Sequence, residues 1–532
     1  MPEHLELVIF GLLVAVAGFV VLSGVLKVPY PILLVIGGLA LSLLPGLPTL
    51  ELPPNLVLMI FLPPLLYSAA FFSSPRDLRA NFRPIAFLSV GLVLLTSVTV
   101  AVVGHAVIGL PWPIAFVLGV IVSPTDPVAV SATAQRIGLP RRVVTILEGE
   151  SLVNDGTALV LYRTVVATAV AGSFSVLGAG LDFVFSGVGG VAIGLLVGWV
   201  VSRVRAWVED PLVETTIALF TGYAAYLPAE ELGASGVLAV VAAGLYISLR
   251  SPQMTSARNH LQVFEVLWTM DFLLNSLLFI LVGLQLHSVF DGLSGESSPA
   301  RLALYAALVS LAVVGTRLVW TFPMAYLPRR LSRRLRERDP LPPWRQVAVV
   351  AYAGMRGSVS LAAALSVPLT TQGGAPFPGR DLIIFLTFCV ILVTLVLQGL
   401  SLPYLIRRLG VEDEGEEERE ETEARLRTAE AALEKIGQLE DEEWVREDTA
   451  ERMRELYEYR RRRFAARHSG QSETSEEDGY EERSAMYQRF RQELLGAERE
   501  ALLRLRDEGH ISEGVRRRIE RDPDLEEARL EG

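Results

Sequence analysis

Long apolar segments fill the chain from its start to about residue 410, and they constrain the fold more than any other feature. Thirteen of them are candidate membrane spans, at 4–26, 30–46, 54–72, 84–109, 112–134, 150–172, 180–202, 212–228, 234–249, 262–287, 302–327, 346–370 and 381–406. A bilayer core of about 30 Å needs about 20 apolar residues per helix. Because lipid offers no hydrogen bonds to the backbone, such segments fold as helices. We therefore predict an all-α polytopic membrane protein with about thirteen transmembrane helices.

Charge divides the chain into two parts. Residues 411–532 hold 38 acidic and 23 basic residues, whereas the first 410 hold 21 acidic and 25 basic. We predict a membrane domain at 1–409 and a charged, partly helical cytoplasmic tail at 410–532, which is either a solvated appendage or a segment that binds a regulator. The net charge of −11 belongs to the tail and argues against a nucleic-acid partner.

The basic residues between the predicted spans indicate the orientation. With the tail inside the cell, thirteen spans place the N-terminus outside. The inside connections then carry 20 Lys and Arg residues, and the outside connections carry only Arg301 and Arg380. Cytoplasmic loops of membrane proteins are enriched in Lys and Arg, so this split favours the cell membrane with the N-terminus outside and the tail in the cytoplasm.

The fifth predicted span contains the sequence SPTDP at 123–127. Its two prolines remove helical donors and free backbone carbonyls. Within a membrane such a break is tolerated where it is buried in protein or lines a water-filled cavity. Thr125 adds a hydroxyl and Asp126 a carboxylate beside the freed carbonyls.

The sixth span begins with GESLVNDG at 149–156. Ser151 and Asp155 are four residues apart and share one helix face, and Glu150 and Asn154 form the adjacent stripe. Oxygen-only groups suit a hard cation such as Na⁺, and neither Cys nor His accompanies them. A charged group inside a span is costly, which makes these residues candidates for function.

The twelfth span contains GMRGSVS at 354–360, where glycines flank a charged residue, Arg356. A buried arginine requires an anion, and Glu150 and Asp126 are the candidates. The fifth and twelfth spans are seven apart, as expected for two inverted six-helix repeats joined by a linker helix. Broken helices at corresponding positions of two repeats are typical of a transporter's binding site.

Five stretches together resemble the cation/proton antiporters of the NhaP/NHE type. They are SPTDPVAV (123–130), GESLVNDGTALVLYR (149–163), AEELGASGVLAVVAAGLY (229–246), FLLNSLLFILVGLQL (272–286) and GMRGSVSLAAAL (354–365). The resemblance implies a thirteen-span fold in which the broken fifth and twelfth helices cross at mid-membrane. It also implies a homodimer, with the bilayer, a monovalent cation and H⁺ as partners and with no cofactor or enzyme activity.

The resemblance also implies roles for individual residues. Asp155 would alternately bind H⁺ and the cation, with Ser151 and Thr125 as further Na⁺ ligands. Asn154 would hold Thr125 and Asp126 in the break, and Glu150 and Arg356 would form a stabilising ion pair. The Asn-Asp pair resembles the branch with one titrating carboxylate, which implies electroneutral 1:1 exchange.

One position departs from the family pattern, because Ser68 stands where many relatives have an acid. Ser68 could supply a hydroxyl ligand instead, and the departure bears on cation selectivity. The leading interpretation is exchange of Na⁺ or Li⁺ for H⁺ in pH and sodium homeostasis. The alternatives are K⁺/H⁺ exchange by the same fold and a membrane sensor that does not transport.

Overall fold

The fold comes from a computed structural model of the 532-residue chain. It describes residues 5–43, 54–126, 128, 130–131, 138–171, 176–208, 210–254, 257–285, 298–371, 374–411, 415–440, 442, 444–469, 475–508, 510–512, 515–516, 518–520 and 523. The chain divides into two compact units, Met1–Glu412 and Asp413–Gly532.

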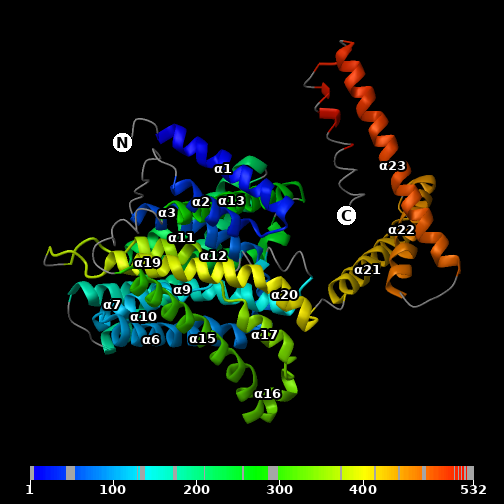
Figure 1. The fold of residues 1–532 in the computed structure, drawn as a ribbon. Helices are drawn as coiled ribbons and strands as arrows, with labels where there is room; N and C mark the ends of the chain where they lie inside the picture. Colours follow the sequence, from blue (N-terminus) through cyan, green and yellow to red (C-terminus); the bar gives the residue numbers. More distant parts are fainter. Residues whose placement is uncertain are drawn as a thin grey trace. The chain divides into compact units, whose positions relative to one another are not determined.

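The first unit is helical and is shown in Figure 1 in blue to yellow. Its helices are α1 (Leu5–Leu26), α2 (Tyr30–Ser42), α3 (Pro54–Phe72), α4 (Pro75–Ala80), α5 (Phe82–Ala86), α6 (Val93–Val103), α7 (Trp112–Ile121), α9 (Arg141–Ala171), α10 (Val176–Arg205), α11 (Pro211–Glu231), α12 (Gly236–Met254), α13 (Ala257–Leu284), α15 (Pro299–Leu331), α16 (Arg333–Arg338), α17 (Trp344–Tyr352), α18 (Ser358–Leu365), α19 (Arg380–Leu392) and α20 (Gly399–Leu409). Three π-helical segments, η1 (Phe87–Leu92), η2 (Gly104–Ile108) and η3 (Val393–Gln398), continue neighbouring helices.

Five stretches among the described residues are long and apolar enough to cross a bilayer, namely Phe82–Ile108, Gly180–Arg205, Leu261–Leu284, Pro299–Leu331 and Arg380–Leu409. Figure 1 shows the last of them as one long helix through α19 and α20. Shorter apolar helices lie in α1, α2, α3, α7 and α12. Each of the thirteen predicted spans overlaps at least one helix, so the all-α polytopic prediction is confirmed. The inverted repeats stay a prediction.

Small residues allow the helices of this unit to pack closely. On α10, Gly190 and Gly194 face Ser235 and Ala239, so that a side-chain carbon at either glycine would collide with a backbone oxygen of the segment that leads into and forms α12. In lipid, helices associate mainly through close packing, and small residues at the contact let the backbones approach. The sequence of α10 therefore fixes its position against α12.

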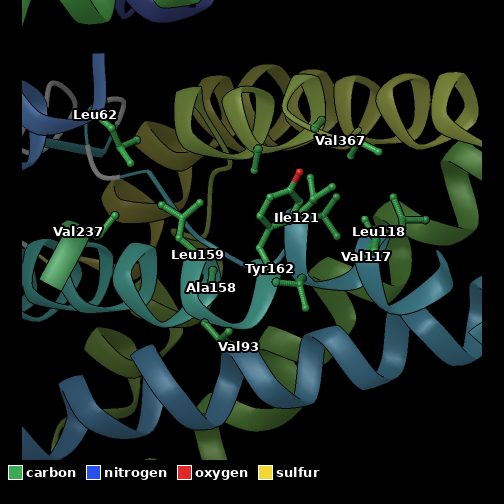
Figure 2. Packing of buried hydrophobic residues seen from close by; sticks show 14 of the residues in the cluster. Leu62, Val93, Val117, Leu118, Ile121, Ala158, Leu159, Tyr162, Val237 and Val367 are labelled. Atoms are coloured by element: carbon green, nitrogen blue, oxygen red, sulfur yellow. The ribbon is translucent and has the colours of Figure 1, made fainter. Parts of the chain in front are cut away.

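The largest apolar core surrounds the end of α7 and the middle of α9, as Figure 2 shows. Several helices contribute to it, with Leu62, Val93, Val117, Leu118, Ile121, Ala158, Leu159, Tyr162, Val237 and Val367 among its members. Tyr162 on α9 also accepts a hydrogen bond from Ser366 at 2.9 Å. This core holds the last residue of α7, Ile121, beside α9, and thereby positions the chain that follows.

The second unit consists of α21 (Glu416–Leu439), α22 (Glu447–Ser469) and α23 (Ser475–Asp507) within the described residues. α21 and α22 pack against each other, and Arg425 of α21 lies over the ring of Phe464 of α22. α23 is the longest of the three, with 33 residues. In α21, Glu and Arg residues four positions apart, such as Glu421 and Arg425, form ion pairs that stabilise an exposed helix.

Candidate ion-binding site

The chain leaves helical geometry after α7 and runs as an irregular segment through Ser123 and Asp126. Pro124 cannot donate to a helical carbonyl, which explains why the helix stops here. Thr125 and Asp126 are nevertheless 6% and 8% exposed, so this irregular backbone is buried in protein. The second proline of the motif, Pro127, lies outside the described residues.

Two side chains of α9 bind the irregular segment at Thr125. The Ser151 hydroxyl donates to the Thr125 carbonyl oxygen at 2.8 Å, and Asn154 Nδ2 donates to Thr125 Oγ1 at 2.8 Å. Thr125 Oγ1 in turn donates to Glu150 Oε1 at 3.3 Å. Both sets of α9 side chains that the sequence indicates therefore contact the irregular segment. The oxygen atoms of Ser151 and Thr125 keep lone pairs that can accept a cation.

Asp155 lies one helical turn beyond Ser151 and is 6% exposed. Its Oδ1 atom is buried and has no hydrogen-bond partner among the described parts of the chain. The carboxylate interacts electrostatically with that of Asp126. A buried polar atom without a partner is costly, and a bound proton or cation would remove that cost.

The second irregular segment runs from Ala353 to Gly357, between α17 and α18, and it meets the first. The backbone N–H of Asp126 donates to the carbonyl oxygen of Met355 at 2.8 Å. Arg356 Nε donates to the carbonyl oxygen of Val122 at 3.2 Å. Each break thus satisfies polar groups that the other exposes, which is what allows both to exist inside a membrane.

Gly357 lies against the Asp126 carboxylate, and a methyl group there would overlap Asp126 Oδ2. We expect Gly357→Ala to lower the free energy of unfolding by about 1–3 kcal/mol, because overpacking displaces the contact between the breaks. Thermal denaturation in detergent measures this loss. Gly18→Ala is the matched control, since nothing lies within 4 Å of the added carbon. Equal denaturation midpoints for the two variants would contradict the close approach.

The predicted ion pair between Glu150 and Arg356 is wrong, because Arg317 of α15 occupies the Glu150 carboxylate. Arg317 Nη1 bonds to Oε1 and Nη2 bonds to Oε2 at 2.9 Å, with both side chains 1% exposed. Arg317 also donates to the carbonyl oxygen of Val350 at 2.9 Å, in the last turn of α17. Gly354 makes room for it, since a methyl group there would collide with Arg317 Cδ.

Arg356 is fully buried and satisfies itself mainly with backbone oxygens. It donates to the carbonyls of Gly354 and Val122, and its own backbone N–H donates to Thr394 Oγ1 at 3.1 Å. Thr394 lies in the π-helical segment η3, a feature that recurs at functional sites. No carboxylate of the described residues forms an ion pair with Arg356. One carbonyl from each break accepts from the guanidinium, and its Nη2 atom is buried without a hydrogen-bond partner among these residues.

Ser68 makes its hydrogen bonds outside this cluster. It is on α3, is 0% exposed, and donates to Asp271 Oδ1 on α13 at 2.7 Å. Neither Arg317 nor Asp271 was among the sequence-based candidates. Their signal was present, since each is a charge within an apolar span, but the spacing along the chain does not show which partner such a charge meets.

The chain is similar to known proteins of one family. Residues 11–408 match the family described as sodium/hydrogen exchanger, transmembrane. A protein of Mycobacterium tuberculosis named an uncharacterized Na⁺/H⁺ exchanger is 38% identical, over 98% of this chain and 96% of its own. The Na⁺/H⁺ antiporter ApNhaP of Aphanothece halophytica is 33% identical, over 82% of this chain and 80% of its own.

A solved structure shares the fold. The sodium proton antiporter of Methanocaldococcus jannaschii matches with a TM-score of 0.59 and 21% identity, over 76% of this chain and 99% of its own. With the two breaks meeting beside α9 and a family match across nearly all of the first unit, this chain belongs to the sodium/hydrogen exchanger family.

Proposed function

We propose that this multi-pass membrane protein exchanges Na⁺ or Li⁺ for H⁺ at the site around Asp155. One observation carries the proposal: a buried Asp155 oxygen lacks a partner among the described residues, one turn from the Ser151 hydroxyl and the Thr125 carbonyl. These are oxygen ligands, which a hard monovalent cation prefers. The family consists of transporters, so the chain is a transporter and not an enzyme.

The charges buried around the two breaks support exchange of one cation for one proton. Three carboxylates, Asp126, Glu150 and Asp155, face two guanidinium groups, Arg317 and Arg356, and each of the five is at most 8% exposed. With all five ionised the region carries a net charge of −1. One Na⁺ or one H⁺ therefore neutralises it, as expected for electroneutral 1:1 exchange.

The same charge count supplies a mechanism. A proton and Na⁺ compete for the Asp155 oxygens, and either occupant neutralises the region. The unoccupied region would have to carry its charge through the hydrophobic barrier when the site changes sides, which its desolvation cost opposes. The two loaded forms cross and the empty form does not, so transport is coupled and leak is prevented.

A second candidate is exchange of K⁺ for H⁺. A relative from Bacillus pumilus, named a sodium, potassium, lithium and rubidium/H⁺ antiporter, is 33% identical over 71% of this chain and 58% of its own. A family site of this kind is thus compatible with several alkali ions.

The homodimer, the outside N-terminus, the cytoplasmic tail and its regulator are also proposals, supported by the family resemblance and the distribution of basic residues.

The test uses purified protein in liposomes that contain a pH-sensitive dye and carry an imposed pH gradient. We expect NaCl and LiCl to dissipate the gradient, at the same rate with and without a potassium–valinomycin clamp. A response to KCl alone would replace the first candidate with the second. No response to any of the three salts, with insertion verified, would overturn antiport.

A further inference from the structure

Asp271 is a carboxylate in the interior of α13, inside the apolar stretch Leu261–Leu284. Its two oxygens are held by neutral donors on different helices. Ser68 of α3 donates to Oδ1 at 2.7 Å, and Asn275 Nδ2, one turn along α13, donates to Oδ2 at 3.1 Å. Ser68 and Asn275 are 0% and 4% exposed, so the carboxylate is held by buried groups.

No basic side chain among the described residues forms an ion pair with Asp271, whereas two other acids of this unit are paired. Glu214 is paired with Arg205, and Glu150 with Arg317. An ionised group in a membrane span is retained at a cost, and neutral donors do not cancel its charge. Asp271 itself is only half-buried, whereas Glu150 and Glu214 are each 1% exposed.

The position of Asp271 connects it with the site around Asp155. Asp271 interacts electrostatically with Asp126, and Asp126 interacts with Asp155. Tyr30, at the start of α2, interacts with both Asp271 and Asp126 and packs beside Phe272. Among the described residues, no set of three acidic, His or Cys side chains is close enough to share one metal ion. Asp271 lies within electrostatic range of Asp126, and its partners Ser68 and Asn275 differ from the side chains that contact Thr125.

We propose that Asp271, held by Ser68 and Asn275, is a separate recruiting site for the transported monovalent cation on its way to Asp155. The carboxylate, the Ser68 hydroxyl and the Asn275 amide supply only oxygen ligands to an ion, as a hard cation prefers. Its fixed negative charge raises the local cation concentration and so lowers the concentration needed for transport. This inference rests on the proposed function of the Asp155 site.

Asp271→Asn removes the charge and keeps the size of the side chain. At fixed pH in the liposome assay, we expect the apparent KM for Na⁺ to rise about tenfold, equivalent to about 1.4 kcal/mol, with a maximal rate within about twofold of wild type. Glu265→Gln is the matched control, because Glu265 is an exposed acid on the same helix. Its KM is expected to stay unchanged.

Exchanging the two residues of the Ser68–Asp271 contact distinguishes recruitment of a cation from a purely structural hydrogen bond between α3 and α13. The double variant Ser68→Asp with Asp271→Ser moves the carboxylate to the other side of the same contact, and we expect its KM to return to within about threefold of wild type. An unchanged KM in Asp271→Asn, or a reduced maximal rate at unchanged KM, would overturn the proposal. If Asp271→Asn does not insert into the liposomes, the double variant tests the proposal instead. An apparent KM for Na⁺ tenfold above that of wild type in the double variant would also overturn it.

Cation binding without transport separates this inference from the proposed function. We expect Na⁺ to stabilise the detergent-solubilised wild type against heat, with the midpoint of the effect at about tenfold higher Na⁺ in Asp271→Asn. If the wild type fails to exchange ions, the proposed function is overturned. The Na⁺ midpoints of wild type and Asp271→Asn still test the role of Asp271 in that case. Equal midpoints would refute recruitment whether or not transport is observed.

Discussion

Asp155→Asn is expected to abolish cation/proton exchange. The amide keeps the size of the side chain but neither carries a charge nor releases a proton at physiological pH. The Oδ1 atom that lacks a partner among the described residues is then no longer a charged ligand. The measurement is dissipation of the pH gradient by NaCl and LiCl in liposomes, where we expect at least a hundredfold loss of rate, about 2.7 kcal/mol.

The control for this variant is Asp182→Asn, which removes an exposed acid of α10. We expect it to exchange ions at the wild-type rate. Asp155→Asn should insert and elute from size exclusion as the wild type does, because Asp155 makes no ion pair among the described residues. Wild-type exchange by Asp155→Asn would show that another group carries the proton.

Glu150→Gln is expected to lower the free energy of unfolding by about 3–5 kcal/mol, since it leaves the buried Arg317 guanidinium without its carboxylate. Both side chains of this pair are 1% exposed, so water cannot compensate the stranded charge. Arg317 also bonds to the carbonyls of Val350 and Ala353, and Glu150 accepts from Thr125. The variant should therefore disturb both breaks as well as stability.

The double variant Glu150→Gln with Arg317→Gln tests the pairing. Removing both charges avoids the stranded ion, and we expect its thermal denaturation midpoint to lie above that of either single variant. Arg163→Gln is the control, because its pair with Glu230 is partly exposed and should contribute about 1 kcal/mol or less. Additive losses in the double variant would refute direct coupling between Glu150 and Arg317.

The helices and the two breaks could be predicted because their causes are local. Length and apolarity define a span, Pro124 ends α7, and glycines interrupt the helix around Arg356. The spacing of Ser151 and Asp155 on one helix also places them on one face without knowledge of other helices. The part of the site built by α7 and α9 is for this reason accessible from sequence.

Partner choice could not be predicted in the same way, because it depends on how distant helices pack. Arg317 and Arg356 are both buried arginines, and only the three-dimensional packing shows that Glu150 pairs with Arg317. The contact between Ser68 and Asp271 likewise joins residues 203 positions apart. Arg356 was expected to pair with an acid, but carbonyl oxygens of the two breaks accept from its Nε and Nη1 atoms instead.

The imbalance of one charge among the five buried groups around the breaks has a consequence for valence. A divalent ion bound at Asp155 would convert the net −1 of the region to +1, so its desolvation cost would be as large as that of the empty site. Ca²⁺ has a radius similar to that of Na⁺ and also prefers oxygen ligands. The charge imbalance therefore favours monovalent cargo, since a site loaded with a divalent ion would face the same barrier as the empty site.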